Sequence, residues 1–318
     1  MPSADPWTRS VRAVLLAAML CAQPALAQSL NDALPRDSIF DTNHAARYSR
    51  PEAIPGDEES VRRRTWGIVA ANSIGVAVYG KSKWWGDGFR SNFSTRDEGW
   101  FGQHTYSGGA DKLGHFFMNY ASARVFSRVF EWAGNDPERA RHTAAWMTLA
   151  TFTAVEVLDG YSRKWRFSKE DVVMNLAGVG AALLLEHQRA LDDAVDLRFL
   201  YQQSREGGKG ADPFGDYSGQ TYLLVLKADA IPGWRSHPLL RYVEFAAGYG
   251  TRGYGTPVPG SESRHVFFGI SLNLSRVLDD TVYRRSTDEA RSREVVRTFL
   301  ELVQVPGTVA LERRTLGK

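Results

Sequence analysis

The chain has almost no cysteine. Its 318 residues include one, Cys21, so an internal disulfide framework is excluded. Cys21 lies in an apolar run that follows two arginines and precedes an Ala-x-Ala sequence ending at Ala27. This pattern predicts a signal peptide over residues 1–27. Leu20 is too large for a lipoprotein signal, so we expect no lipid anchor at Cys21 and a mature chain without thiol chemistry.

A strong excess of one charge is absent as well. The 39 Lys and Arg residues nearly balance the 36 Asp and Glu residues, and removal of a leader containing Asp5, Arg9 and Arg12 lowers the formal charge from +3 to +2. We therefore expect no nucleic-acid partner. Arginines cluster at residues 62–64 and 284–285, where they either end helices in solvent or face anionic lipid head groups.

Long apolar runs are scarce after the leader. Val61–Gly80 comes close to the roughly 20 residues that span a bilayer. The polar Asn72 and Ser73 argue against spanning, and the small residues also suit a tightly packed buried helix, so both interpretations stay open. The apolar parts of two later helices, Ala144–Leu158 and Val172–Leu185, are shorter than a span, which favours burial in protein.

Two segments lack a regular apolar period. Residues 28–60 contain several prolines and acids, which predicts an extended lead-in. Lys81–Gly109 is a long loop rich in glycine and in aromatic residues such as Trp85 and Trp100. Such loops are more often functional than idle. This one fits a membrane interface, a lid over a polar site, or a plain hydrophobic cap.

Helical periodicity dominates residues 61–190. Apolar side chains recur at three- and four-residue steps over Asp111–Trp132 and Glu138–Asp159. The sequence Ser168-x-x-Asp171 predicts a capped helix that continues to about Arg189. Together with the preceding apolar segment, these stretches predict an antiparallel hairpin array of three to four helices.

Beyond residue 190 the period becomes that of strands. Strands are predicted at Gln220–Lys227, Arg241–Tyr249 and Arg264–Leu274, and a polar connecting helix at Thr281–Arg297. The predicted fold class is therefore α+β: a mainly helical hairpin array followed by a small antiparallel β-sheet. The predicted divisions are a signal peptide (1–27), a lead-in (28–60), a helical domain with a polar site (61–190) and a β region with a C-terminal tail (191–318).

Polar residues recur in pairs inside the apolar helices. The members of each pair are three or four residues apart and therefore share one helix face. Three helices can thus present six oxygen or nitrogen ligands to one point, as in helical carboxylate metal sites. The cofactor is not identified by this pattern, but a divalent metal is the candidate. The candidate ligands are Asp111, His115, Glu156, Asp159, Asp171 and Asn175.

A second interpretation needs no metal. His115 would act as a general base or nucleophile oriented by Asp111, with Glu156 or Asp159 as the general acid. Lys112 would stabilise a developing negative charge.

A structural interpretation also stays open. Asp111 and Asp171 suit the starts of their helices, where a carboxylate is favourable in any case. Glu156, Asn175 and His115 lie within apolar segments, so they would form a buried network that fixes helix packing.

The order of these motifs resembles a known family. The motifs are Asp111-Lys-x-x-His115, Tyr120, Glu156-x-x-Asp159-Gly160, Ser168-x-x-Asp171 and Asn175-x-x-Gly178. They resemble the signature of the YfiM-like family of predicted periplasmic lipoproteins and, more distantly, the VanZ-like membrane family. Asp216–Tyr222 and Gly248–Gly250 resemble the C-terminal part of its longer members. The resemblance implies an envelope location and helices at or in a membrane, and it supplies no established reaction.

From the residues and the resemblance we expect an exported, membrane-associated protein of the periplasm and cell envelope, with the outer membrane as one candidate. Its partner would be a membrane surface or a lipid. Its buried site would carry out hydrolysis or transfer on a lipid or glycan. The alternative is a non-enzymatic envelope scaffold in which the same polar residues fix helix packing.

Overall fold

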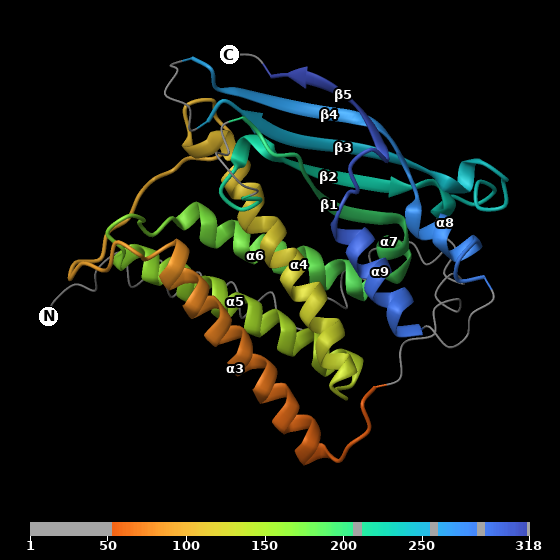
Figure 1. The fold of residues 1–318 in the computed structure, drawn as a ribbon, viewed down its shortest axis with the longest axis horizontal. Coiled ribbons are helices and arrows are strands. Elements are labelled where there is room, and N and C mark those ends of the chain that lie inside the picture. The colour runs from red at the N-terminus through yellow and green to blue at the C-terminus, as the bar shows by residue number, and fades with distance from the viewer. Residues whose placement is uncertain (1–52, 206–211, 255–259, 285–289, 317–318) are drawn as a thin grey trace, which may run out of the picture.

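The computed structural model describes residues 53–205, 212–254, 260–284 and 290–316. The predicted signal peptide and Cys21 lie outside these residues. The elements are α3 (Glu58–Lys83), α4 (Ala110–Trp132), α5 (Pro137–Tyr161), α6 (Lys169–His187), α7 (Arg189–Ala194), β1 (Val195–Tyr201), β2 (Gln220–Lys227), β3 (Val243–Arg252), β4 (Ser263–Leu272), α8 (Leu274–Asp280), α9 (Ala290–Leu302) and β5 (Val309–Thr315). A helical array precedes an antiparallel sheet (Figure 1), which confirms the predicted α+β fold.

Local sequence explains where the helices of the array begin. Asp136 caps α5 by accepting a hydrogen bond from the Arg139 amide, and Pro137 follows in the first turn. Ser168 caps α6 by accepting from the Asp171 amide, as predicted. The helix predicted over Glu138–Asp159 continues through Gly160 and ends at Tyr161.

The core of the array lies around α4, which packs against both α5 and α6. Phe117 and Tyr120 of α4 meet Val179 and Leu185 of α6 in one buried apolar cluster. The closest approach of the two helices is at Gly178, where a side-chain carbon would strike the carbonyl oxygen of Phe116.

The helix α3 lies beside α5 with the same chain direction. Asn72 donates to the Thr151 hydroxyl at 2.9 Å, and Asn135 donates to the Thr65 hydroxyl nearer the start of both helices. Both helices lie on the side of the array away from the sheet (Figure 1).

The prediction of a tightly packed buried helix at residues 61–80 is wrong. Gly80 is the one fully buried residue of α3, whereas Trp66 is 66% exposed and Ile74 64% exposed. The physical reason is that α3 packs on the array along one side only, through Ile68 and Val69. The spanning interpretation also lacks support, because no helix in the described part of the chain has the length and apolarity needed to cross a membrane.

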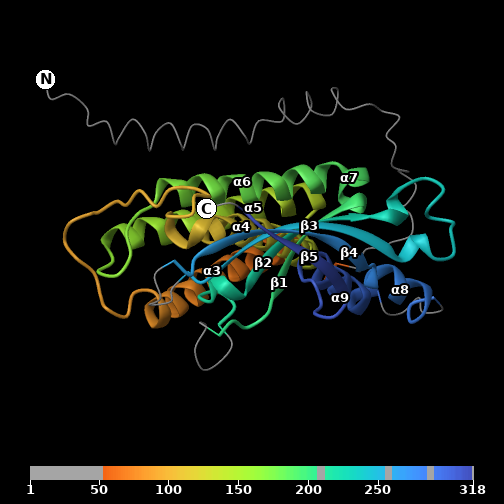
Figure 2. The ribbon, with the colours of Figure 1, turned by 90° about the horizontal axis from the view of Figure 1, so that it is seen from above.

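The five strands form an antiparallel sheet in the order β1-β2-β3-β4-β5, and the sheet covers one side of the array (Figures 1 and 2). The three predicted strands are β2, β3 and β4, while β1 and β5 were not predicted. In β1 the charged residues Asp196 and Arg198 alternate with apolar ones, yet both are buried. The predicted helix at Thr281–Arg297 overlaps α9, and residues 285–289 lie outside the described ones.

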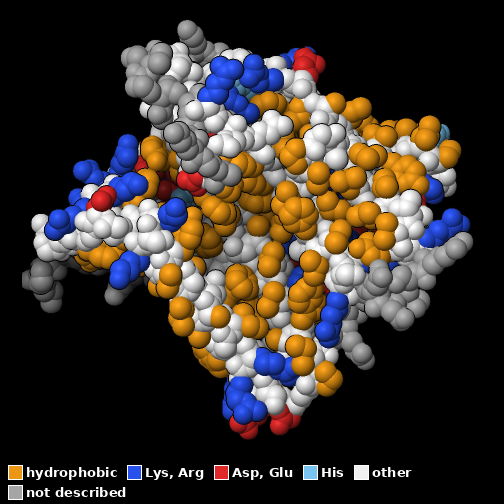
Figure 3. Space-filling model, viewed as in Figure 1, with side chains coloured by type: hydrophobic (Ala, Val, Ile, Leu, Met, Phe, Trp, Pro, Cys, Tyr) orange, Lys and Arg blue, Asp and Glu red, His pale blue; other side chains and the backbone are white. Residues whose placement is uncertain are grey.

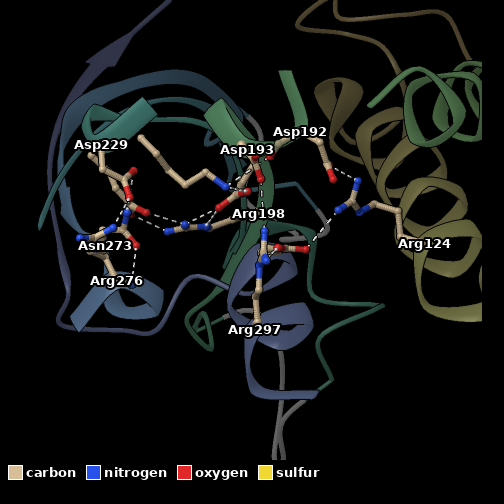
Figure 4. Close-up of polar contacts among 12 residues, drawn as sticks. Arg124, Asp192, Asp193, Arg198, Asp229, Asn273, Arg276 and Arg297 are labelled. Carbon is tan, nitrogen blue, oxygen red and sulfur yellow. Dashed lines mark hydrogen bonds and ion pairs between the residues drawn. The ribbon is translucent and has the colours of Figure 1, made fainter. Parts of the chain in front are cut away.

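One set of buried ion pairs lies within the sheet, and a second joins α4 to the elements that flank the sheet (Figure 4). Arg198 of β1 donates to Asp196 and to both oxygens of Glu244 on β3. Arg124 of α4 donates to Asp192 of α7 at 2.5 Å and to Glu301 of α9 at 3.1 Å. Because α9 packs against β1, the Arg124 pairs connect the helical array to the β region.

The contact at Gly178 generates a stability prediction with a control on the same helix. Gly178→Ala should lower the free energy of unfolding by about 1–3 kcal/mol, because α4 and α6 must separate to admit the methyl group. Gly180→Ala should leave it unchanged or raise it by up to about 1 kcal/mol, since nothing lies within 4 Å and alanine favours the helix. Urea unfolding of both variants measures the difference, and equal effects would contradict the close approach.

Candidate functional site

A turn with left-handed backbone conformation precedes α4 and directs the first turn of this helix toward the array. Ser107, Gly108 and Gly109 have φ values of 50°, 60° and 90°. The Gly108 carbonyl accepts a hydrogen bond from the Tyr249 hydroxyl of β3. A side chain on Gly109 would strike the ring of Phe101, so glycine is required there for space as well as for backbone conformation.

Lys112, in the first turn of α4, is fully buried and holds three carboxylates. Its ammonium lies 2.9 Å from Asp111 Oδ2, 2.5 Å from Asp171 Oδ1 on α6 and 2.5 Å from Glu98 Oε2 on the preceding loop. Burial alone would lower the pKa of Lys112, but these carboxylates outweigh it and raise the pKa well above its usual value. Its three hydrogens all have acceptors within the protein.

His115, one turn further along α4, stands between two sets of oxygens. Its Nε2 lies 3.9 Å from Asp111 Oδ1 and 3.7 Å from Asp171 Oδ2. Its Nδ1 lies 3.1 Å from Asn175 Oδ1 and 3.6 Å from Glu156 Oε1. The side chain is 23% exposed, so the ring links the buried cluster to solvent.

Three of the six predicted metal ligands come together. One atom each from Asp111, His115 and Asp171 lies within 4.8 Å of the others. Lys112 takes one oxygen of each aspartate, and the other oxygen faces His115 Nε2.

The other three predicted ligands lie outside this set. Glu156 and Asn175 face the opposite nitrogen, Nδ1, of His115. Asp159 accepts a hydrogen bond from the Trp85 indole at 2.7 Å.

Burial and crowding shift the proton affinities of the cluster. Burial lowers the pKa of His115, but Asp171, Asp111 and Glu156 overcome this effect and raise it to about 9. Burial raises the pKa of Glu156 to about 8 and that of Asp159 to about 6. At neutral pH, His115 is therefore a cation and Glu156 holds a proton, so His115 must first lose its proton before it can act as a base.

The pKa values of the two aspartates near His115 Nε2 shift in opposite directions. Burial raises the pKa of Asp171 despite the neighbouring cations. Burial acts in the same sense on Asp111, but His115, Lys112 and a hydrogen bond from Tyr217 hold its pKa below the usual value. Asp111 is thus the more readily ionised of the two.

Sequence reasoning missed three residues of the site. Glu98 binds Lys112, and Trp85 donates to Asp159, both from the aromatic loop. The Tyr217 hydroxyl donates to Asp111 Oδ1 at 2.6 Å from the segment before β2. Their positions depend on tertiary contacts, although an acid such as Glu98 within an aromatic loop was a usable signal.

The network leaves two buried amide atoms without a hydrogen-bond partner among the described residues, Asn175 Nδ2 on α6 and Asn119 Oδ1 on α4. Asn175 Oδ1 accepts from Asn119 Nδ2 and faces His115 Nδ1. Asn175 is 2% exposed. A packing network would be expected to satisfy both atoms.

The raised pKa of His115 generates a direct test. In the metal-free protein, nitrogen NMR of the histidine rings should show His115 as an imidazolium at pH 7.5, titrating near 9. His265 is the internal control, because burial and two nearby arginines lower its pKa to about 4, so it should be neutral at the same pH.

The raised pKa of His115 also makes the stability of the protein depend on pH. The contribution of His115 is fully present below its ordinary pKa of 6.5 and is lost as pH rises through about 9. A His115 ring that is already neutral at pH 7.5 would contradict the charge distribution of the site.

Comparisons with known proteins add one match. Residues 97–187 match the model of a family described as predicted periplasmic lipoprotein (DUF2279). Neither the comparison with curated proteins nor that with solved structures returned a match. The family description confirms the predicted location, periplasmic and membrane-associated in the cell envelope. The finer YfiM-like and VanZ-like resemblance stays a prediction. Over the stretch that holds the helical part of the site, from Glu98 to Asn175, the chain is similar to predicted periplasmic lipoproteins.

Proposed function

We propose that this chain is a divalent-metal-dependent hydrolase or transferase acting on a lipid or glycan of the cell envelope. The observation that supports it is the convergence of Asp111, His115 and Asp171, with one ligand atom each within 4.8 Å of the others. Two carboxylates and an imidazole suit several divalent metals. Three protein ligands leave positions for water or substrate, as in catalytic rather than closed structural sites.

The charge of the cluster favours a cation at this point. The carboxyl groups around the site outnumber its two cations, Lys112 and His115. The carboxyl groups are those of Glu98, Asp111, Glu156, Asp159 and Asp171. Without a metal, the proton on His115 is already included in this count, and the proton on Glu156 removes one further negative charge. A metal would displace the His115 proton and supply the missing charge.

The surroundings of His115 suit a ligand. Its Nδ1 faces Asn175 Oδ1, a contact that fixes the ring and leaves Nε2 toward the two aspartates. The 23% exposure of the ring gives solvent and substrate a way in. A metal held here would activate water or polarise an ester or phosphoryl oxygen.

The remaining residues take supporting roles. Glu156 is 2% exposed and faces His115 Nδ1, so its role here is to orient the ring from the side away from the two aspartates. Lys112 has no spare hydrogen, so its role here is to position the two aspartates rather than to stabilise a developing charge.

Metal binding by matched variants tests the proposal. Wild-type chain should retain zinc, manganese or magnesium in elemental analysis after dialysis. A metal at about 100 times its dissociation constant should raise the melting temperature by about 5 °C. His115→Gln and Asp171→Asn should abolish this shift. Glu186→Gln is the control, because it removes a buried carboxyl from the far end of α6 and should keep the shift.

Activity gives the second readout. Hydrolysis of bis(p-nitrophenyl) phosphate or p-nitrophenyl acetate by the metal-loaded chain should fall at least about 100-fold in His115→Gln. If wild-type chain binds none of the three metals and shows no thermal shift, the metal proposal fails. Folded variants that keep wild-type envelope function would favour the scaffold alternative.

A further inference from the structure

We infer that the end of the helical array that holds the site docks on an anionic lipid surface, and that the substrate of the site is a lipid with a negatively charged head group. We call this end the rim; it consists of the C-terminal ends of α3 and α5, the N-terminal end of α6 and the loop 84–109. The substrate assignment rests on the proposed function, whereas the docking does not.

Exposed cations gather at the rim. They are Lys81, Lys83, Arg96, Arg163, Lys164, Arg166 and Lys169. The exposed acids among the described residues of the rim are fewer, Asp87 and Asp97. Figure 3 shows a group of Lys and Arg side chains at the left, over the loop and the adjoining helix ends. Each cation held near an anionic leaflet adds to binding, so the rim complements such a surface.

Aromatic side chains stand among these cations. Phe89 is 47% exposed, Trp100 44%, Phe93 42% and Tyr161 39%. Aromatic rings are favoured at the boundary between lipid head groups and acyl chains. The combination of exposed rings and cations is typical of a surface that lies at this boundary rather than in water.

The rim is ordered before any lipid arrives. Arg90 donates to the Ser162 carbonyl at 2.7 Å, and Arg163 donates to the Phe89 carbonyl at 3.2 Å. The Trp165 indole donates to the Trp84 carbonyl at 3.0 Å. These bonds join the aromatic loop to the segment after α5, so docking would cost little ordering entropy.

The same loop reaches the site. Trp85 donates to Asp159, Glu98 binds Lys112, and Asp97 pairs with the exposed Lys169 at 3.6 Å. A surface that contacts Phe89 and Trp100 therefore lies against the loop that lines the cluster around His115. Docking would place lipid head groups beside the loop that contacts Asp159 and Lys112.

The other apolar surfaces fit lipid less well. The sheet exposes Phe268 and Ile270, which are 52% and 56% exposed, on the same face as Tyr249. Their partners on the neighbouring strands are apolar or acidic, so no cation of the described strands lies directly beside them; these partners are Ala247, Phe245, Ala310 and Glu312. The opposite ends of α3 and α5 mix exposed acids, such as Glu58 and Glu138, with arginines. Of the described surfaces, the rim best combines exposed rings with an excess of cations.

Vesicle flotation of the full chain tests the inference. Wild-type chain should bind vesicles of 30% phosphatidylglycerol in phosphatidylcholine at least about tenfold more strongly than pure phosphatidylcholine vesicles. Lys164→Glu with Arg166→Glu should lower the partition coefficient on the anionic vesicles by at least about tenfold. Phe89→Ser with Trp100→Ser should lower it several-fold on the same vesicles.

Two controls separate docking from other causes. Phe268→Ser with Ile270→Ser removes comparable apolar surface from the sheet and should bind as wild type. His115→Gln should also bind as wild type, so docking is measured independently of the metal and the reaction. Equal binding to both vesicle types, wild-type binding by folded rim variants, or a loss in the sheet variant equal to theirs would overturn the inference.

Discussion

The buried ammonium of Lys112 is the constraint on which the site depends. A lone buried cation is costly, and three carboxylates from the loop and two helices offset that cost. Because Lys112 occupies one oxygen of Asp111 and one of Asp171, the remaining oxygens face His115. Removing Lys112 would leave three buried acids facing one another. The same ion pairs therefore hold the starts of α4 and α6 together and set the geometry of the site.

This arrangement leaves more negative than positive charge in the buried cluster, and the protein must neutralise part of that excess. With a pKa of about 9 for His115 and about 8 for Glu156, protons supply this neutralisation at neutral pH. A site designed for packing alone would gain from fewer carboxylates, since buried ion pairs are often replaceable by apolar residues without loss of stability. The excess of carboxylates favours an incoming cation over a purely structural network.

The sequence predicted the parts of the fold and site that depend on local spacing. Residues three or four apart share a helix face, so the pairing of Asp111 with His115 could be predicted, as could the cap at Ser168. Glu98 and Tyr217 could not, because loop and sheet contacts bring them to the cluster from distant positions. The prediction of a buried helix at α3 was wrong because apolar composition alone does not show whether a helix has neighbours on all sides.

Chain direction explains why the site and the rim coincide. Because α3 and α5 run the same way while α4 and α6 return, the ends of the first two meet the starts of the others at one end of the array. The sheet then fixes that end from the other side: Tyr249 of β3 holds the turn before α4, and Tyr217 holds Asp111. A helical array without the sheet would lack both contacts, which assigns the β region a role in positioning the site rather than in chemistry.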